Sequence, residues 1–221
     1  VGLDTAGEEL NGLSLTAETK NQAPTAIALS STMVDENIDT SGGYSVGTLL
    51  TTDADVGDSA TYTINGGTDA AQFTIGGAGS DELILTDGTL DFESKASYEV
   101  TVQVTDAGEL TFDQSFTITV NDVNEMPTID STALTTATED IPYSYAIITS
   151  DPDSGASLTI TTPTLPTWLT LTDNGDGTAT LSGIPTNTDV GDHNVTLEVS
   201  DGILNETQSF TISVTLCLIH I

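Results

Sequence analysis

Apolar and polar residues alternate in two long segments of the chain. Residues 98–105 read Tyr-Glu-Val-Thr-Val-Gln-Val-Thr, and residues 193–199 read His-Asn-Val-Thr-Leu-Glu-Val. A period of two places one set of side chains against a core and the other set toward water. Both segments are therefore predicted to be half-buried β-strands.

Further short strands are predicted between Gly, Asp and Asn turns, at 44–50, 61–64, 83–85, 111–120, 144–148, 158–161, 178–181 and 210–215. Residues 174–177, Asn-Gly-Asp-Gly, predict a hairpin turn. The glycine-rich segment 76–84 matches one nonapeptide of a calcium β-roll, but such rolls need stacked copies, so a glycine hairpin loop is favoured. About seven short strands in roughly 100 residues are typical of a β-sandwich.

The chain of 221 residues contains an internal repeat. The segment 98–106 returns as 193–201, and Phe-Thr-Ile-Thr-Val at 116–120 returns as Phe-Thr-Ile-Ser-Val at 210–214. Two copies of one domain follow. We expect an all-β protein of two tandem Greek-key β-sandwiches, at 21–125 and 126–215. Residues 1–20 are expected to be the tail of a preceding module, and 216–221 a frayed or truncated end of a fragment.

The charge of the chain limits its partners. There are 34 acidic and 2 basic side chains, so the formal net charge is -32. With only Lys20 and Lys95 to neutralise phosphates, nucleic-acid binding and docking on anionic membranes are excluded. No apolar run is long enough to insert into a membrane. Cations are the expected partners.

Acidic residues gather where strands are expected to end. Carboxylates placed this close repel one another, and the two lysines cannot neutralise them, so a counter-ion from solution is expected. Calcium takes six to eight oxygen ligands, whereas zinc prefers His or Cys, of which the chain has only His193, His220 and Cys217. The single cysteine also forbids an intrachain disulfide. The expected cofactor is Ca2+.

Four of these segments carry a family resemblance. Residues 34–37 (Val-Asp-Glu-Asn), 53–57 (Asp-Ala-Asp-Val-Gly), 90–93 (Leu-Asp-Phe-Glu) and 122–127 (Asp-Val-Asn-Glu-Met-Pro) follow one another as the calcium motifs of cadherins do. Residues 21–125 thus resemble a bacterial-type cadherin repeat. Residues 126–215 look like the dystroglycan-type cadherin-like, or immunoglobulin-like, variant.

The resemblance implies calcium ions at the joint between the two domains. Its implied ligands are Glu36, Asp91, Glu93, Asp122, Asn124, Glu125, Asp151 and Asp153. Glu125, Met126 and Phe92 depart from the family pattern, so fewer than the family's three ions are expected there.

A second, weaker site is expected upstream at Asp53 and Asp55. The preceding residues, Thr-Lys-Asn-Gln at 19–22, lack the linker carboxylates, so this site is expected to be weak or empty. Glu139 or Asp140 with Asp201 could serve a further joint beyond residue 215, although 216–221 supply no acidic linker.

These features favour a calcium-binding adhesion or spacer module of a large bacterial surface or secreted protein, located outside the cell. Its expected partners are calcium and neighbouring repeats, with other adhesins or polysaccharide also open. No catalytic constellation stands out, so no enzyme is expected. The alternative function is carbohydrate binding through Tyr143, Tyr145 and Trp168, although Trp168 lies in an apolar context typical of a core. Homophilic adhesion remains a third possibility, for which the sequence identifies no contact surface.

Overall fold

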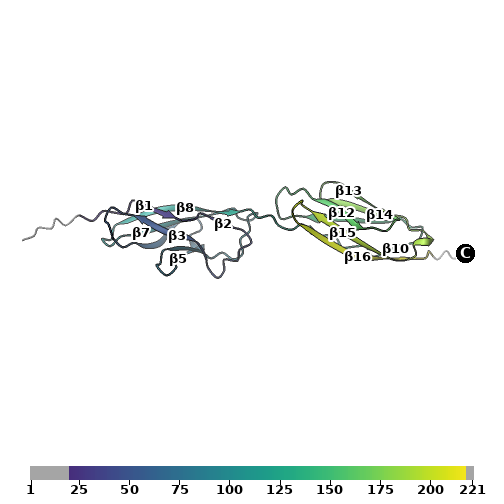
Figure 1. The fold of residues 1–221 in the computed structure, drawn as a ribbon, viewed down its shortest axis with the longest axis horizontal. Helices are drawn as coiled ribbons and strands as arrows, with labels where there is room; N and C mark the ends of the chain where they lie inside the picture. Colours follow the sequence, from purple (N-terminus) through teal and green to yellow (C-terminus); the bar gives the residue numbers. More distant parts are fainter. Residues whose placement is uncertain (1–19, 218–221) are drawn as a thin grey trace, which may run out of the picture. The chain divides into compact units, whose positions relative to one another are not determined.

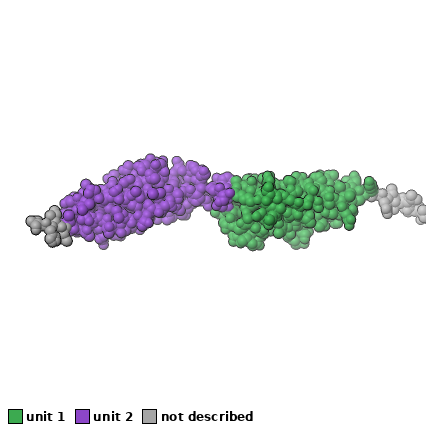
Figure 2. Space-filling model, turned by 180° about the vertical axis from the view of Figure 1, so that it is seen from behind, with its two compact units in different colours: residues 1–90, 95–121 green, residues 91–94, 122–221 purple. Residues whose placement is uncertain are grey.

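The computed structural model describes residues 20–217. They divide into two compact units, coloured separately in Figure 2: unit 1 holds 20–90 and 95–121, and unit 2 holds 91–94 and 122–217. The contacts thus separate the chain between Asn121 and Asp122, four residues before the boundary expected from the sequence. The expected tail at 1–20 and end at 216–221 lie almost wholly outside the described residues.

Unit 1 consists of two four-stranded sheets, β1-β3-β6-β5 and β2-β8-β7-β4 (Figure 1). All neighbouring strands are antiparallel except β2 and β8, which are parallel. Its strands are β1 (Ala26–Leu29), β2 (Met33–Asp35), β3 (Tyr44–Thr52), β4 (Thr61–Gly66), β5 (Phe73–Gly76), β6 (Glu82–Leu85), β7 (Ser97–Thr105) and β8 (Thr111–Asn121), with a short 3-10 helix, η1, at Ala70–Gln72.

Unit 2 repeats this plan with the sheets β10-β16-β15-β12 and β13-β14-β11-β9. Again one pair, β10 and β16, is parallel and the others are antiparallel. Its strands are β9 (Thr128–Ile129), β10 (Thr136–Thr138), β11 (Tyr143–Ser150), β12 (Thr159–Thr164), β13 (Leu169–Asp173), β14 (Thr178–Gly183), β15 (Gly191–Ser200) and β16 (Asn205–Thr215), with the 3-10 helix η2 at Asn187–Asp189. The predicted fold class, two all-β sandwich domains in tandem, is confirmed.

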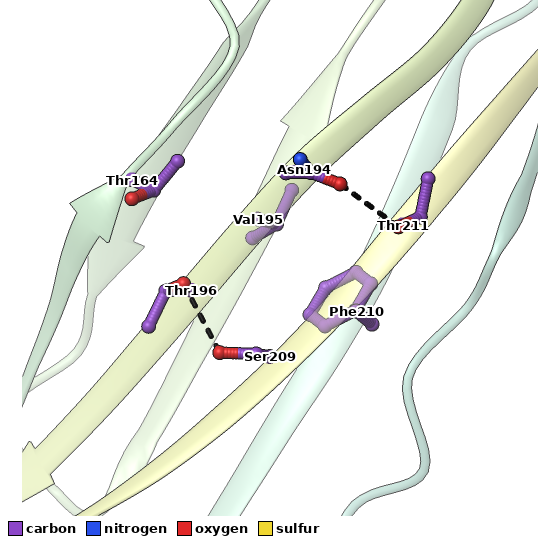
Figure 3. Close-up of a pocket in the computed structure, with 7 residues that line it drawn as sticks. All are labelled: Thr164, Asn194, Val195, Thr196, Ser209, Phe210 and Thr211. Atoms are coloured by element: carbon purple, nitrogen blue, oxygen red, sulfur yellow. Dashed lines mark hydrogen bonds between the residues drawn. The ribbon is translucent and has the colours of Figure 1, made fainter.

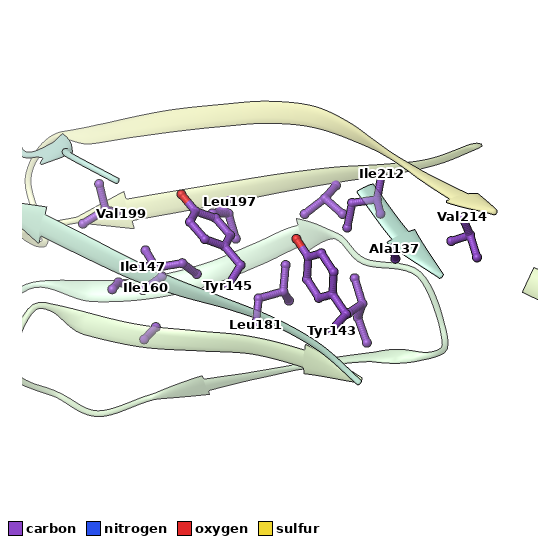
Figure 4. Packing of buried hydrophobic residues seen from close by; sticks show 13 residues of the cluster. Ala137, Tyr143, Tyr145, Ile147, Ile160, Leu181, Leu197, Val199, Ile212 and Val214 are labelled. Carbon is purple, nitrogen blue, oxygen red and sulfur yellow. The ribbon is translucent and has the colours of Figure 1, made fainter. Parts of the chain in front are cut away.

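The alternation in the sequence becomes the inner and outer faces of these sheets. In β7, Val100, Val102 and Val104 are at most 1% exposed, while the residues between them lie on the outer face. In unit 2, β11 supplies Tyr143, Tyr145 and Ile147 to a core that faces residues of β14, β15 and β16 (Figure 4). Burial of these apolar surfaces is the main force that holds each sandwich together.

The structure contains several short strands that the sequence analysis did not predict. They are β1, β2, β5, β9, β10 and β13, none longer than five residues. Alternation over so few positions gives little local signal, and these strands are defined by the neighbours with which they pair. The two predicted hairpins are present: Gly76 pairs with Glu82 between β5 and β6, and Asn174 donates from its backbone N to the Thr178 carbonyl oxygen at 3.0 Å between β13 and β14.

Helix plays almost no part in the described chain, where η1 and η2 have three residues each. Neither they nor any other helix of residues 20–217 has the length and apolarity needed to cross a membrane.

Candidate metal centre

The loop after β3 in unit 1 and the loop after β11 in unit 2 have the same local structure. The backbone N of Asp55 donates to Asp53 Oδ1 at 2.9 Å, and that of Asp153 donates to Asp151 Oδ1 at the same distance. Such turns, in which an aspartate accepts from the backbone two residues on, are a common property of this side chain. Each loop then turns at a glycine with positive φ, 86° at Gly57 and 89° at Gly155.

In unit 2, a second loop brings Asp201 to Asp151 and Asp153. Asp201 directly follows β15, and at least one carboxylate oxygen of each of these three residues lies within 4.8 Å of the others. Backbone donors hold Asp201 in place, since Oδ1 accepts from the N atoms of Ile203 at 2.6 Å and Leu204 at 2.7 Å. Three carboxylates therefore converge from two loops that are about 50 residues apart in the chain.

The residues that connect the two domains make two further bonds to this group. Asn124 Nδ2 donates to Asp201 Oδ2 at 2.8 Å, and the backbone N of Glu125 donates to Asp153 Oδ2 at 2.7 Å. The hydrogen bonds from the Ile203 backbone and the Asn124 side chain hold the pKa of Asp201 below its usual value. Asp201 thus stays ionised within a group of like charges.

Two carboxylate oxygens of this group have no donor. Asp151 Oδ2 and Asp153 Oδ1 are buried from solvent and accept no hydrogen bond within the described structure. Burial, followed by the charges of Asp153 and Asp201, raises the pKa of Asp151. Buried polar atoms are almost always paired in native proteins, so these oxygens require a partner that is not part of the chain.

A divalent cation fits this donor set. Within residues 20–217 there is one ion pair, between Lys95 and Asp69, and it lies in unit 1. No lysine ammonium therefore neutralises the carboxylates of unit 2. Carboxylate oxygens are the ligands of hard cations, and calcium accepts several at once. Such an ion would accept the lone pairs of Asp151 Oδ2 and Asp153 Oδ1 and cancel the repulsion among the three side chains.

The other implied ligands are distributed as follows. In unit 2, oxygens of Glu93 and Asp122 lie within 4.8 Å of an oxygen of Asp153, so Asp153 belongs to two carboxylate groups. Asp91, also in unit 2, accepts two hydrogen bonds from Ser94, from Oγ at 2.8 Å and from the backbone N at 3.0 Å, and these bonds lower the pKa of Asp91.

Glu36 belongs to unit 1, where it is 3% exposed and its backbone N donates to the Asn121 carbonyl oxygen at 3.2 Å. Its participation in a site with residues of unit 2 remains a prediction.

The weaker site expected at Asp53 and Asp55 has a different composition in the structure. Asp53 is grouped with Asp58 and Asp106, all within unit 1 and with oxygens within 4.8 Å of one another. Asp55 Oδ2 accepts from the backbone N of Gln22 at 2.6 Å. Asn21 Nδ2 donates to Asp106 Oδ2 at 2.9 Å, as Asn124 does to Asp201 in unit 2.

Asp58, Asp106 and Asp201 are the residues that the sequence analysis missed at these sites. Asp106 and Asp201 end the repeated strand segment, so for these two the repeat itself carried the signal. Assigning Asp201 to a joint beyond residue 215 was wrong. Asp201 follows Ser200, which pairs with the first residues of β12 and β16, whereas Thr215 ends β16. Glu139, by contrast, does lie near that end, since its Oε2 accepts from the backbone N of Cys217 at 3.4 Å.

The aromatic residues of unit 2 do not form an exposed platform. Tyr143 and Tyr145 are each 4% exposed, and their hydroxyls donate to the carbonyl oxygens of Leu134 at 2.7 Å and Ser131 at 3.0 Å. Trp168 is half-buried and packs edge-on against Tyr143, with ring centroids 5.7 Å apart. These contacts are typical of a core and give no support to carbohydrate binding by these rings.

A surface hollow of about 410 Å³ lies on unit 2 beside β15 and β16 (Figure 3). Its polar groups are hydroxyls and an amide that pair across the strands, Thr196 with Ser209 at 3.1 Å and Thr211 Oγ1 with Asn194 Oδ1 at 2.9 Å. No carboxylate lines it, so it differs in chemistry from the acidic groups.

Known protein families match both units. Residues 31–121 match the family model described as "Cadherin domain", and residues 126–215 match the one described as "Putative Ig domain".

Solved structures share the fold. The chain is similar to protocadherin gamma B2 extracellular cadherin domains 1–5, with a TM-score of 0.63 and 23% identity over 90% of this chain and 40% of that one. It is also similar to domains 3–6 of the same protein, with a TM-score of 0.62 and 22% identity over 86% and 47%. Human protocadherin-24 EC1-2 gives a TM-score of 0.60 and 19% identity over 88% and 99%. The chain thus spans less than half of the two gamma B2 structures. Sequence, fold and family models agree that this chain consists of a cadherin domain followed by an immunoglobulin-like domain.

Proposed function

We propose that this chain is a calcium-binding part of an extracellular adhesion protein, where it acts as a stiff spacer or adhesion module and performs no catalysis. The observation that supports calcium most directly is the pair of buried, unpartnered oxygens of Asp151 and Asp153, beside Asp201. The cadherin and immunoglobulin-like families support the adhesion role.

Calcium would act by removing like-charge repulsion and by fixing loops. In the metal-free unit 2, the carboxylates of Asp151, Asp153 and Asp201 oppose one another across a few ångströms. A bound ion replaces this repulsion with attraction to each carboxylate, so the free energy of binding becomes stability of the folded state. At a calcium concentration 100 times the dissociation constant, one such site adds about 2.7 kcal/mol.

The proposal extends to ligands of both domains. Under it, Glu36 of the first domain and the connecting residues Asp122, Asn124 and Glu125 share ions with carboxylates of the second domain, as the cadherin motifs imply. An ion held by both domains would restrict their relative motion. This property would make the tandem a spacer with a defined length rather than two freely rotating modules.

Calorimetric titration of the whole chain with calcium tests the binding. The double variant Asp151→Asn with Asp153→Asn keeps the shape of both side chains and removes two charges, and it should bind at least one ion fewer. The matched control is Asp192→Asn, which removes an exposed charge on β15 outside the acidic groups. An absence of calcium uptake at millimolar concentration, or equal uptake by the double variant, would refute the proposal.

The shared ligands are tested separately. In the unaltered chain, calcium should narrow the distribution of interatomic distances measured by small-angle X-ray scattering. The double variant Asp122→Ala with Glu125→Ala should take up less calcium, and its distance distribution should not respond to the ion. If uptake falls but the scattering does not respond to calcium in the unaltered chain, the ion binds without stiffening the tandem, and the spacer role is wrong.

A further inference from the structure

Two of the ten asparagines in the chain begin the motif Asn-x-Thr, in which x is not proline. They are Asn194, followed by Val-Thr, and Asn205, followed by Glu-Thr. This motif marks acceptors of N-linked sugars, in which the asparagine amide nitrogen receives the sugar. Both motifs lie in unit 2, on the neighbouring strands β15 and β16. The structure shows which of the two side chains has room for a sugar.

Strand β15 places both polar residues of the first motif on its outer face. Side chains two residues apart on a strand point to the same side of the sheet. Val195, between them, is 1% exposed and belongs to the core, whereas Asn194 is exposed and Thr196 is partly exposed. A sugar on Asn194 would therefore extend away from the sandwich without displacing a core residue.

The two polar atoms of the Asn194 amide have different surroundings. Oδ1 accepts from Thr211 Oγ1 at 2.9 Å, which holds the side chain against the neighbouring strand β16. Nδ2 donates to no group of residues 20–217, and in Figure 3 it points away from Thr211. The nitrogen that would bond to a sugar thus has no competing partner in the described chain. The hydrogen bond that positions the amide uses the other atom and would survive the modification.

The surface hollow of about 410 Å³ is lined by Asn194 itself (Figure 3). Thr164 lines it from β12, and Ser209 and Thr211 line it from β16. Its volume lies within the range of sites for small ligands. No carboxylate lines it, although the formal net charge of the chain is -32. A neutral sugar ring attached to Asn194 would meet hydroxyl groups there, with which its own hydroxyls can form hydrogen bonds.

Asn205 lacks these surroundings although its motif is the same. Its Nδ2 already donates to Glu198 Oε2 at 2.8 Å, and it does not line the hollow. A sugar on this nitrogen would be placed directly beside the Glu198 carboxylate. The two motifs are equivalent in sequence, and their surroundings in the fold favour Asn194.

We propose that Asn194 is an acceptor for an N-linked sugar whose first ring lies in this hollow. The donor is a sugar activated at C1 as a diphosphate ester, used by a glycosyltransferase. A bond forms between Nδ2 and C1, and the bond from C1 to the diphosphate oxygen breaks. The diphosphate leaves with the electron pair, and Nδ2 gives one proton to a base of the enzyme. The modified amide keeps one N–H and its Oδ1 acceptor. This site does not depend on the calcium binding proposed above.

Mass spectrometry of the protein purified from its natural source tests the site. A protease that cleaves before aspartate yields residues 192–200 and 201–221 as separate peptides, so the two motifs are measured independently. The 192–200 peptide should carry the mass of one or more sugar residues, at a higher occupancy than the 201–221 peptide. An unmodified 192–200 peptide, or an occupancy no higher than that of 201–221, would overturn the proposal.

Variants made in the same source identify the modified atom. Asn194→Gln and Thr196→Val should each abolish the sugar on this peptide, whereas Thr196→Ser, which keeps the hydroxyl of the motif, should retain it. The matched control is Thr211→Val, which removes the hydrogen bond to Oδ1 but leaves the motif intact and should also retain the sugar. A sugar that persists in Asn194→Gln is attached elsewhere, and the proposal is then wrong.

The position of the first ring is tested by nuclear magnetic resonance. The backbone amide resonances of Thr164 and Ser209, on either side of the hollow, should differ between the modified chain and Asn194→Gln. Those of Thr101 and Ser115 in unit 1, whose hydroxyls pair at 2.9 Å across β7 and β8, should not change. If Thr164 and Ser209 do not respond, the ring does not occupy the hollow.

Discussion

Asn124 donates a hydrogen bond from Nδ2 to Oδ2 of Asp201 at 2.8 Å, across 77 residues of sequence. Asn21 and Asp106 repeat this bond in unit 1 at 2.9 Å. In both units, an asparagine before the first strand thus orients the aspartate that directly follows a long strand, β7 or β15. The repeated bond links the entry segment of each domain to its acidic group.

Replacing this asparagine should weaken calcium binding without abolishing folding. Asn124→Ala removes the donor that orients Asp201 and helps to keep it ionised, so the calcium affinity of unit 2 should fall severalfold by calorimetry. Asn205→Ala is the matched control, because Asn205 Nδ2 also donates to a carboxylate, Glu198 Oε2 at 2.8 Å, and Glu198 belongs to none of the acidic groups found among the described residues. Equal losses in both variants would contradict the role assigned to Asn124.

Unit 2 should lose stability at alkaline pH through Tyr143. Burial raises the pKa of its phenol to about 12, with a smaller contribution from Tyr145. The unfolded value is about 10. Since the folded-state pKa is the higher one, the stabilisation is fully present below pH 10 and is lost as the pH rises through 12. Denaturant unfolding followed by the fluorescence of Trp168, the only tryptophan, measures this decline, and Tyr143→Phe should flatten it.

Truncation in the core of unit 2 should be costly. Leu181 of β14 is fully buried, and Leu181→Ala should lower the free energy of unfolding by about 2–5 kcal/mol through lost burial and a cavity. Ile148→Ala, at a side chain that is 53% exposed, should cost much less. Chemical denaturation read through Trp168 compares the two, and similar costs would show that Leu181 is not in a packed core.

Gly183 should tolerate no side chain. A Cβ atom built at this position would overlap the backbone carbonyl oxygen of Trp168, which cannot move as a side chain could. Gly183→Ala should therefore disturb the pairing of Leu169 with Gly183 and lower the melting temperature of unit 2. Gly42→Ala, where a Cβ would meet nothing within 4 Å, should leave the melting temperature nearly unchanged, and calorimetric scanning compares the two variants.

Long strands could be predicted from the sequence, and of the strands with five residues or fewer only β6 was predicted. The segment 98–105 alternates over eight residues, and the structure places β7 there with one buried face. Met33–Asp35 has three residues and is a strand because it pairs with Thr119, Val120 and Asn121 of β8. A three-residue strand carries no period of its own, so only its partner defines it.

The sequence predicted the kind of ligand at the candidate sites, carboxylates suited to a cation. It predicted only some of the residues that form each carboxylate group. Clusters such as Asp151 and Asp153 are visible in the sequence because their members are close neighbours. Asp58 and Asp106 are 48 residues apart, and their meeting depends on how two loops are brought to one end of the sandwich. Asp55, which the sequence placed with Asp53, accepts through Oδ2 from the backbone N of Gln22, and its role as a ligand remains a prediction.

By itself, the sequence determined that this chain is a pair of β-sandwiches with an excess of carboxylates that only cations from solution can neutralise. These properties follow from local periodicity, repetition and charge, which do not depend on long-range contacts. The tertiary structure alone decided which carboxylates converge and which of their oxygens lack a donor. Strand pairing sets those distances, and burial of an oxygen is a property of the packed loops around it.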